Sequence, residues 1–266
     1  MKLKNLKERT VLVTGASAGI GEEIAYRFAE AGSSLILTAR RESELQRVAE
    51  KCLRLGAKKA IVKLCDMSQP QSIDELTGFM IDSSTLPDVL ILNAGITQRE
   101  KLFNTDIEVD KRLMEVNFFS NVRIIKNLKE HITSAKQINV AITTSISGVF
   151  GFPLRSAYAS SKRALFGFFE TLELEYPNVS STFIIPGRIN TDISYNAVTG
   201  NGQAYGKMDA GQAAAMSAYK CSKKAFRAIV NDRRKKLIGG FDLIMVHFYK
   251  FIPPLFYHLA KKVSAT

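Results

Sequence analysis

The chain has 266 residues, a length that suits one large α/β domain or two small ones with a substantial core. Hydrophobic residues make up 46% of it and charged residues 23%, which is typical of a soluble globular protein, and no apolar run predicts a signal peptide or a membrane-spanning helix. The net charge of +12 indicates an anionic cofactor, lipid surface or nucleic acid as a partner. The three cysteines are widely spaced and predict neither disulfides nor a zinc site, so a cytoplasmic location is expected.

A glycine-rich turn separates the first predicted strand, Thr10–Thr14, from a helix expected at residues 20–31. Backbone N–H groups at such a helix start, together with its partial positive charge, can hold a pyrophosphate. Glycines after a strand can also make a plain tight turn, but in this βα context the pattern predicts a dinucleotide site. The residues expected to bind the cofactor here are Gly15, Ser17, Ala18, Gly19, Ile20 and Gly21.

Two arginines follow the second predicted strand, residues 34–39. Arg40 stands where an acidic residue would bind a ribose 2′-hydroxyl, which favours a 2′-phosphate and therefore NADP(H) over NAD(H). Ser17 could add a hydrogen bond to that phosphate. The alternative is that Arg40 and Arg41 are only solvent-exposed charges at the start of the next helix, because the acidic residue Glu42 follows closely.

Two further strands are expected at residues 59–64 and 89–92, and polar or small residues follow each of them. In a parallel sheet these strand ends meet at the edge where ligands bind, and the Asp66 carboxylate could reach an adenine amino group there. The residues placed at this edge are Asp66, Met67, Asn93, Ala94 and Gly95.

Helices are expected at residues 68–82 and 106–131, and the second carries Asn117. Asn117 is either a satisfied core amide or part of a polar relay. The alternation of strands and helices predicts a single Rossmann-like domain over residues 1–266, with a doubly wound parallel sheet and helices on both faces.

Three side chains around residue 150 suit proton transfer. Ser145 follows a buried strand at residues 140–144, and Tyr158 and Lys162 share one face of a helix expected at 158–175. An adjacent ammonium favours the phenolate form of a tyrosine, and the serine hydroxyl can hold a substrate oxygen. The alternative is that Tyr158 packs in the core and Lys162 lies on a solvated face.

The last third of the chain begins with a strand at 181–185 and a loop at 193–216 that is rich in Gly, Asn, Ser and Tyr. An ordinary ordered loop would have this composition, whereas the family resemblance described below implies a substrate lid in which Tyr195, Tyr205 and Met208 would face the pocket. A helix at 210–231, a basic run at 233–236 and a short strand near 237–238 are expected next.

Residues 241–266 form an apolar C-terminal extension broken by two prolines. It could cover the substrate cleft, join a partner subunit, lie in a membrane interface beside basic residues, or pack on its own domain. The first predicted apolar face comprises Phe241, Ile244, Met245, Phe248 and Ile252, and the second Leu255, Leu259 and Val263.

These motifs together resemble the short-chain dehydrogenase/reductase family, of the type called classical, over about residues 8–192. The matching residues are Thr14-Gly15-x-x-x-Gly19-x-Gly21, Asp66, Asn93-Ala94-Gly95, Asn117, Ser145, Tyr158-x-x-x-Lys162 and Pro186-Gly187. The region beyond them is more loosely similar to a subgroup with acyl/alkyl-dihydroxyacetone-phosphate reductase-like proteins and 11β-hydroxysteroid dehydrogenases, which implies a hydrophobic substrate. The resemblance also implies a homodimer or homotetramer.

The resemblance implies a catalytic role for Asn117, Ser145, Tyr158 and Lys162. Tyr158 would be the acid/base and Ser145 would orient the substrate oxygen, while Lys162 would bind the nicotinamide ribose and make the phenol more acidic. Asn117 would hold a water that links Lys162 to solvent.

The remaining implied roles concern the cofactor. Asp66 would bind adenine, and Asn93 would stabilise the central strand. The residues that would hold the nicotinamide are Pro186, Gly187, Ile189 and Thr191. Many NADP-dependent relatives carry a basic residue where Ser17 or Ala18 stands, so here the 2′-phosphate would depend on Arg40.

The sequence therefore predicts an NADP(H)-dependent oxidoreductase that interconverts a ketone or aldehyde with an alcohol. An NADP(H)-binding sensor or scaffold without turnover is the alternative. A basic adaptor for membranes or nucleic acids is a third hypothesis, although no nucleic-acid-binding motif supports the latter version.

Overall fold

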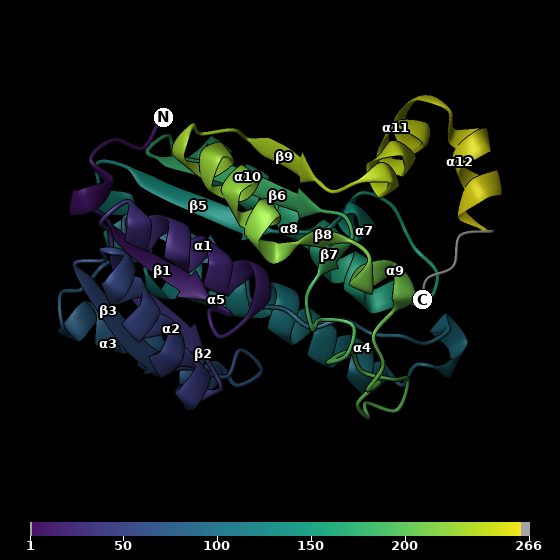
Figure 1. Ribbon diagram of the computed structural model, residues 1–266, viewed down its shortest axis with the longest axis horizontal. Helices are drawn as coiled ribbons and strands as arrows, with labels where there is room; N and C mark the ends of the chain where they lie inside the picture. The colour runs from purple at the N-terminus through teal and green to yellow at the C-terminus, as the bar shows by residue number, and fades with distance from the viewer. Residues whose placement is uncertain (1, 262–266) are drawn as a thin grey trace.

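The computed structural model describes residues 2–261, and its centre is a seven-stranded parallel sheet with helices on both faces (Figure 1). The strand order β3-β2-β1-β4-β5-β6-β9 confirms the predicted doubly wound, Rossmann-like fold. The strands are β1 (Thr10–Thr14), β2 (Ser34–Ala39), β3 (Lys59–Leu64), β4 (Val89–Leu92), β5 (Ile138–Thr143), β6 (Val179–Pro186) and β9 (Lys235–Ile238).

Helices enclose the sheet on both sides, so its central strands are buried at every position. One face packs against α1 (Gly19–Glu30), α2 (Glu42–Leu55) and α10 (Ala218–Val230). The other packs against α3 (Pro70–Asp82), α5 (Ser120–Asn127) and α8 (Ser156–Glu175). A short 3₁₀ turn, η1 (Leu6–Glu8), precedes the first strand.

The order of the strands reverses at β1. This strand pairs with β2 on one side and with β4 on the other, so the crossovers on its two sides run in opposite directions. The reversal leaves a crevice at the carboxyl ends of β1 and β4, the place where ligands bind in open α/β sheets.

The long helix predicted at residues 106–131 is interrupted by a π-helical turn, η3 (Glu115–Phe119), which contains Asn117. Wider turns of this kind often mark functional positions, because the extra residue turns one side chain out of helical register. The segment runs through η2 (Leu102–Asn104), α4 (Ile107–Met114), η3, α5 and α6 (Lys129–Ser134).

The single helix predicted at 210–231 is wrong. The chain forms α9 (Ala210–Ala213) and then a short strand, β8 (Met216–Ser217), which pairs with β7 (Ile189–Asn190). The Ser217 hydroxyl then caps α10 by accepting a hydrogen bond from the backbone N–H of Lys220 at 3.3 Å. Because the serine cap starts a new helix at this point, the one continuous helix that was expected is replaced by two shorter ones.

The C-terminal extension packs on its own domain through η4 (Phe241–Leu243), α11 (Ile244–Phe251) and α12 (Pro253–Ala260). The Phe256 ring lies 4.8 Å from the ring centroid of Phe150 and 5.1 Å from that of Tyr249. This aromatic contact sets which side of α12 faces inward.

The two predicted apolar faces of the extension are therefore partly wrong. Phe241 is 85% exposed and Ile252 is 48% exposed, although Met245 and Phe248 do pack on the core. In α12 the buried residues are Phe256 and Ala260 rather than Leu255 and Leu259, and Val263 lies outside the described residues.

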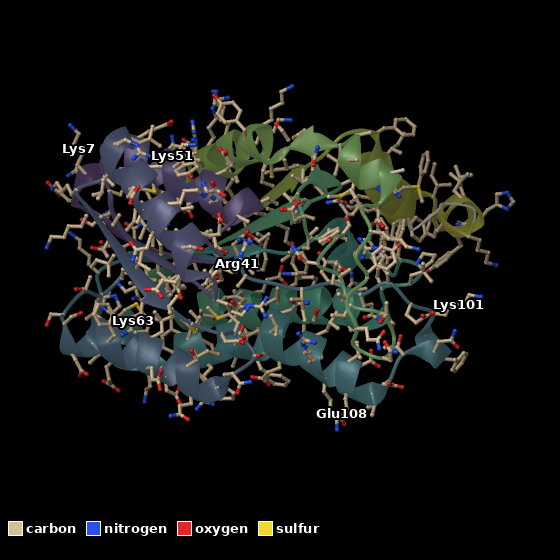
Figure 2. All side chains as sticks on the ribbon, turned by 60° about the horizontal axis from the view of Figure 1, so that its bottom comes forward. Lys7, Arg41, Lys51, Lys63, Lys101 and Glu108 are labelled. Carbon is tan, nitrogen blue, oxygen red and sulfur yellow. The ribbon has the colours of Figure 1, made fainter. Side chains whose placement is uncertain are left out.

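Basic side chains lie at both ends of the long axis of the molecule. Figure 2 shows Lys7, Lys51 and Lys63 at one end, Lys101 at the other, and Arg41 between them. Within residues 2–261, every helix is too short or too polar to cross a bilayer.

Candidate active site

A cavity of about 380 Å³ opens at the carboxyl ends of the central strands, in the crevice beside β1 and β4. All the predicted catalytic and cofactor residues line it except Gly21 and Asn117, which lie directly behind its wall. The predicted residues in the lining are Gly15, Ser17, Ala18, Gly19, Ile20, Arg40, Asp66, Met67, Asn93, Ala94, Gly95, Ser145, Tyr158, Lys162, Pro186, Gly187, Ile189 and Thr191.

The glycine-rich turn has a backbone that only glycine adopts without strain. Gly15 and Gly19 have φ values of +66° and +61°, and a Cβ atom at Gly21 would lie 2.4 Å from the Gly15 carbonyl oxygen. Ala18, the N-cap residue of α1, has no side-chain acceptor for the first N–H groups of the helix. The turn therefore fits the pyrophosphate of a dinucleotide, which requires close backbone approach and N–H donors.

Arg40 and Arg41 both line the cavity, and Arg41 contacts Ser17. The Arg41 Nη2 donates to the Ser17 hydroxyl at 3.3 Å and to its carbonyl oxygen at 3.4 Å. Sequence reasoning chose Arg40 and did not assign Arg41 to the site. The two adjacent arginines were the sequence signal for a cation here. Which of them reaches Ser17 depends on the local backbone conformation, which the sequence does not show.

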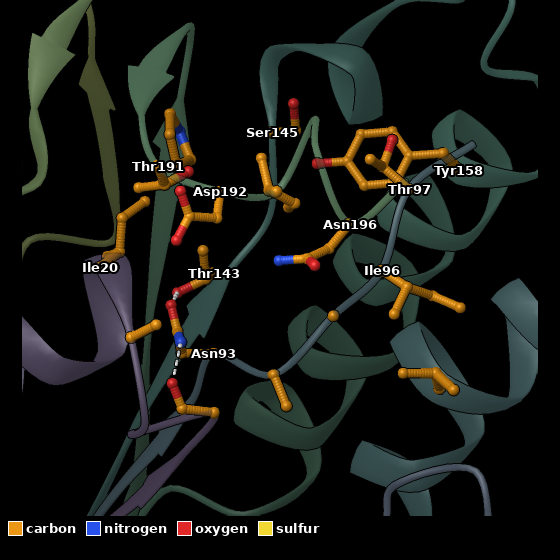
Figure 3. Close-up of a pocket in the computed structure, with 18 of the residues that line it drawn as sticks. Ile20, Asn93, Ile96, Thr97, Thr143, Ser145, Tyr158, Thr191, Asp192 and Asn196 are labelled. Carbon is orange, nitrogen blue, oxygen red and sulfur yellow. Dashed lines mark hydrogen bonds between the residues drawn. The ribbon is translucent and has the colours of Figure 1, made fainter. Parts of the chain in front are cut away.

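Asn93 ties the ends of three strands together. Its Nδ2 donates to the carbonyl oxygen of Thr14 at 3.2 Å. Its Oδ1 accepts from the Thr143 hydroxyl at 3.2 Å, as Figure 3 shows. The Thr14 hydroxyl in turn accepts from the backbone N–H groups of Asn93 and Ala94. This network holds β1, β4 and β5 in register at the crevice, so Thr14 and Thr143 belong to the site, although the sequence assigned a role to neither.

Asp66 is held in a tight turn after β3. One of its carboxylate oxygens accepts from the backbone N–H of Ser68 at 2.9 Å and from the Ser68 hydroxyl at 2.8 Å. These two bonds orient the carboxyl group at the end of the cavity that Arg40 also lines.

Ser145 and Tyr158 face each other across the cavity. Figure 3 shows the phenol oxygen of Tyr158 pointing toward Ser145. Ser145 caps the short helix α7 (Ile146–Val149), and its hydroxyl oxygen accepts from the backbone N–H of Ser147 at 3.1 Å. Tyr158 belongs to the first turn of α8 and is 6% exposed.

Lys162 lies one helical turn behind Tyr158 and is almost completely buried. Its Nζ donates to the Thr143 carbonyl oxygen at 2.9 Å. Burial in the protein interior lowers the pKa of Lys162 to about 8, because the charged form loses its hydration. A Cβ atom at Gly95 would lie 3.2 Å from this Nζ, so a glycine there leaves room for the ammonium.

Asn117 is a fully hydrogen-bonded amide. Its Oδ1 accepts from the Ile96 N–H at 2.8 Å, and its Nδ2 donates to the Ile96 carbonyl oxygen and to the Ser161 hydroxyl. The side chain thus joins the π-helical turn to the segment after β4 and to α8. These contacts show a satisfied amide, and the role of Asn117 in a polar relay stays a prediction.

The loop after β6, which is predicted to hold the nicotinamide, contacts the C-terminal extension. The Asp242 carboxylate accepts from the backbone N–H of Arg188 at 2.7 Å, and a Cβ atom at Gly187 would lie 1.7 Å from the same oxygen. Sequence reasoning missed Asp242, because a single acidic residue in an apolar tail carries no recognisable motif.

The substrate side of the cavity differs from the prediction. Tyr195, Tyr205 and Met208 do not contribute to the lining. Backbone hydrogen bonds from Tyr205 to Ala197 and from Gly206 to Tyr195 fold this segment back on itself, away from the cavity. Beyond the predicted residues, the cavity lining includes Ile96, Thr97, Arg112, Val116, Ile146, Phe152, Arg155, Arg188, Asp192, Ile193, Asn196 and Gln212.

Arg155 adds a cation beside Tyr158. Burial and the nearby Arg99 guanidinium lower the pKa of Arg155 to about 10. Its Nη2 lies 3.5 Å from the carboxylate of Asp209, which also forms a buried ion pair with Arg99 at 2.6 Å. In residues 2–261 no group of His, Cys, Asp and Glu side chains is arranged to hold a metal ion.

Comparisons with known proteins agree with this geometry. Residues 9–201 match the short chain dehydrogenase family. An Anopheles gambiae protein named dehydrogenase/reductase SDR family protein 7-like is 34% identical over 268 residues, covering 98% of this chain and 84% of its own. Human dehydrogenase/reductase SDR family member 7 is 31% identical over 266 residues, covering 97% and 78%.

Two solved structures share the fold. A short chain dehydrogenase/reductase from Burkholderia phymatum in complex with NAD superposes with a TM-score of 0.82 at 18% identity, covering 95% of this chain and 96% of its own. An alcohol dehydrogenase from Thermococcus sibiricus complexed with 5-hydroxy-NADP gives 0.74 at 22% identity, covering 88% and 97%. The chain therefore belongs to the short-chain dehydrogenase/reductase family of oxidoreductases.

Proposed function

We propose that the protein is an NADP(H)-dependent oxidoreductase that interconverts a ketone or aldehyde with the corresponding alcohol. The observation that carries this proposal is the phenol of Tyr158, which points toward Ser145 inside a cavity that the glycine-rich turn also lines (Figure 3). A non-catalytic NADP(H) sensor is less well supported, because nucleotide binding alone does not require a hydroxyl, a phenol and a buried ammonium around one cavity.

Two hydroxyl groups hold the substrate oxygen in this proposal. The Ser147 N–H already donates to the Ser145 hydroxyl oxygen, so the hydroxyl proton of Ser145 is available to the substrate. Tyr158 donates its proton to the carbonyl oxygen during reduction and recovers it during oxidation, as a general acid and base.

Lys162 stabilises the charge that proton transfer leaves on the phenol. Its pKa of about 8 keeps most of the ammonium charged at neutral pH, and its bond to the Thr143 carbonyl oxygen fixes its position. That positive charge, one helical turn from Tyr158, attracts the negative oxygen that forms when the phenol gives up its proton.

The nicotinamide supplies the hydride when it is bound. Pro186, Gly187, Ile189 and Thr191 would hold the ring, and Lys162 would contact the ribose. Arg40 and Ser17 would bind the 2′-phosphate of NADP(H), because both line the cavity and Arg40 directly follows β2.

The test of this function is turnover by the purified protein. NADPH oxidation is followed with short ketones, 3-ketosteroids and keto-lipids, and NADH serves as the parallel reductant. Because Ile96, Ile146 and Phe152 give the cavity an apolar wall, we propose a hydrophobic, lipid- or steroid-like substrate. Preference for short polar ketones would contradict this substrate class, and no oxidation with any compound would contradict the enzymatic function.

Replacing Arg40 by alanine is expected to weaken NADPH binding by about 10- to 100-fold and to leave NADH binding unchanged, since a hydrogen bond to a charged group contributes roughly 1.5–3 kcal/mol. Only NADPH carries the 2′-phosphate. Fluorescence titration of both coenzymes measures the effect, with Arg41→Ala tested in parallel and the exposed Arg54→Ala as the control. Equal losses for NADPH and NADH in Arg40→Ala would remove the assigned phosphate contact.

We also propose that the protein is a cytoplasmic homo-oligomer whose C-terminal extension contacts membranes peripherally. Phe119 and Leu174 are 49% and 76% exposed on adjoining helices, which supports a subunit interface that light scattering can test. In the extension, Phe251 and Tyr257 are 67% and 57% exposed, and residues 244–261 contain lysines and histidines but no acidic residue.

The membrane contact predicts flotation with anionic liposomes and weaker flotation with zwitterionic ones. Phe251→Ser is expected to reduce flotation because it removes an exposed apolar anchor. Equal recovery of the wild type and the variant, or no flotation at all, would refute this contact.

A further inference from the structure

The helix that carries Tyr158 and Lys162 begins without a cap of its own. Its N-cap residue is Arg155, and a guanidinium has no acceptor for the first N–H groups of a helix. Those groups lack partners within any α-helix, and helix ends fray where they stay unsatisfied. Tyr158 is the third residue of α8, so it belongs to the turn that depends most on an external acceptor.

Gln98 supplies that acceptor from a distant part of the chain. Its Oε1 accepts from the backbone N–H groups of Ala157 at 3.1 Å and of Tyr158 at 3.2 Å. These are the second and third helical positions, the same two that a serine or aspartate cap would satisfy from within the helix. The Gln98 Nε2 donates to the hydroxyls of Ser156 and Thr105, and the side chain is fully buried.

The backbone around Gln98 is held on both sides. The Val198 N–H donates to the Thr97 carbonyl oxygen, and the Arg99 N–H donates to the Val198 carbonyl oxygen, both at 2.9 Å. The Arg99 guanidinium also pairs with the buried carboxylate of Asp209. These contacts therefore fix the backbone that carries Gln98, the acceptor for the first turn of α8.

We propose that Gln98 is a positioning residue for the reaction: it caps the helix that carries the acid/base and holds the Tyr158 phenol in line with Ser145. The proposal rests on the proposed function, in which Tyr158 exchanges the proton. Loss of the cap would let the first turn move, and misplacement of a reacting group by about 1 Å can lower the rate by about 100-fold.

The test compares three substitutions of Gln98. Gln98→Met keeps the length of the side chain but removes the acceptor, whereas Gln98→Asn keeps the amide and withdraws it by one methylene. Gln98→Glu keeps an acceptor of the same reach, and negative charge is favourable at a helix N-terminus. Gln46→Met, on the exposed face of α2, controls for the substitution itself.

The expected result is a kcat lowered about 10- to 100-fold in Gln98→Met and Gln98→Asn, with NADPH affinity unchanged and most of the loss recovered in Gln98→Glu. The primary isotope effect with NADPH deuterated at the transferred position should rise in the two impaired variants, since the chemical step becomes slower. Wild-type kcat and isotope effect in both Met and Asn variants would overturn the proposal, as would an equal loss in Gln98→Glu.

Amide hydrogen exchange of the peptide that begins α8 gives a readout independent of turnover. Ala157 and Tyr158 should exchange faster in Gln98→Met and Gln98→Asn than in the wild type, and unchanged exchange would overturn the cap. If the wild type reduced no carbonyl compound but its α8 amides still exchanged more slowly than those of the variants, the proposed function would be wrong and the cap would stand. Should Gln98→Met fail to fold, Gln98→Asn carries the comparison.

Discussion

Tyr158→Phe is expected to lower kcat by a factor of about 10²–10⁴, the usual contribution of a positioned general acid or base. The phenylalanine ring keeps the packing of Tyr158 against Leu113, Ala157 and Val198, so the fold and the binding of NADPH should be retained. What is lost is the phenol proton donor that points toward Ser145.

Steady-state NADPH oxidation and a fluorescence titration of NADPH together separate the two effects. Tyr219→Phe, a partly exposed tyrosine on α10 outside the cavity, is the matched control. If Tyr158→Phe turned over at the wild-type rate, another group would have to supply the proton and the assigned acid/base would be wrong.

Lys162→Met is expected to abolish most of the activity and at the same time to stabilise the fold at neutral pH. The difference between an ordinary lysine pKa of 10.5 and the value of about 8 at this site corresponds to a burial cost of roughly 3 kcal/mol. Methionine removes that cost but leaves the Thr143 carbonyl oxygen without its donor, which costs roughly 1–2 kcal/mol. A net gain in unfolding free energy of about 1–2 kcal/mol is expected.

The stability gain should depend on pH in a defined direction. The unfolded chain binds the lysine proton more tightly than the folded protein does, so the wild type gains stability as the pH rises from about 8 toward 10.5. Above that range the lysine is neutral in both states and its charge no longer matters.

Denaturant unfolding of wild type and Lys162→Met near neutral pH and at about pH 10 tests this dependence. The advantage of the variant should be larger at neutral pH and should shrink at the higher pH. A variant that is less stable than the wild type at neutral pH, or an advantage that grows with pH, would mean that burial does not destabilise the charged form of Lys162.

The sequence was sufficient for the parts of the site that lie at strand ends. Gly15, Asn93, Ser145 and Pro186 each end a strand or follow its last residue by one or two positions, and parallel strands bring all their carboxyl ends to one edge. Recognising the strands therefore placed these residues together without knowledge of any contact. Helical spacing put Tyr158 and Lys162 on one face, and their assignment to the site came from combining that pair with Ser145 and the glycine-rich turn.

The missed residues act through contacts between distant segments. Gln98 reaches Tyr158 across 60 positions of sequence, and Arg99 reaches Asp209 across 110. No periodicity or local motif encodes such pairs. Arg155 was missed for a related reason, since its place beside Tyr158 depends on the turn that enters α8.

The C-terminal extension shows a different limit. Helical spacing predicted one apolar face before and one after the two prolines, but the chain turns at Ile252, so the second helix starts with a new orientation. Phe256 then faces the aromatic rings of Phe150 and Tyr249. A periodicity argument cannot predict the rotation of a helix across such a break.

The pairing of β1 has a consequence for how the chain folds. One edge of β1 can pair with β2 soon after both strands are synthesised. The other edge stays unpaired until β4 is synthesised, in which Val89 pairs with Val11. Until translation reaches that point, the strand, with three consecutive apolar residues at its centre, keeps an unpaired row of backbone donors and acceptors that chaperones or other nascent chains can bind. The strand before the glycine-rich turn is thus also a segment of the nascent protein that is open to aggregation.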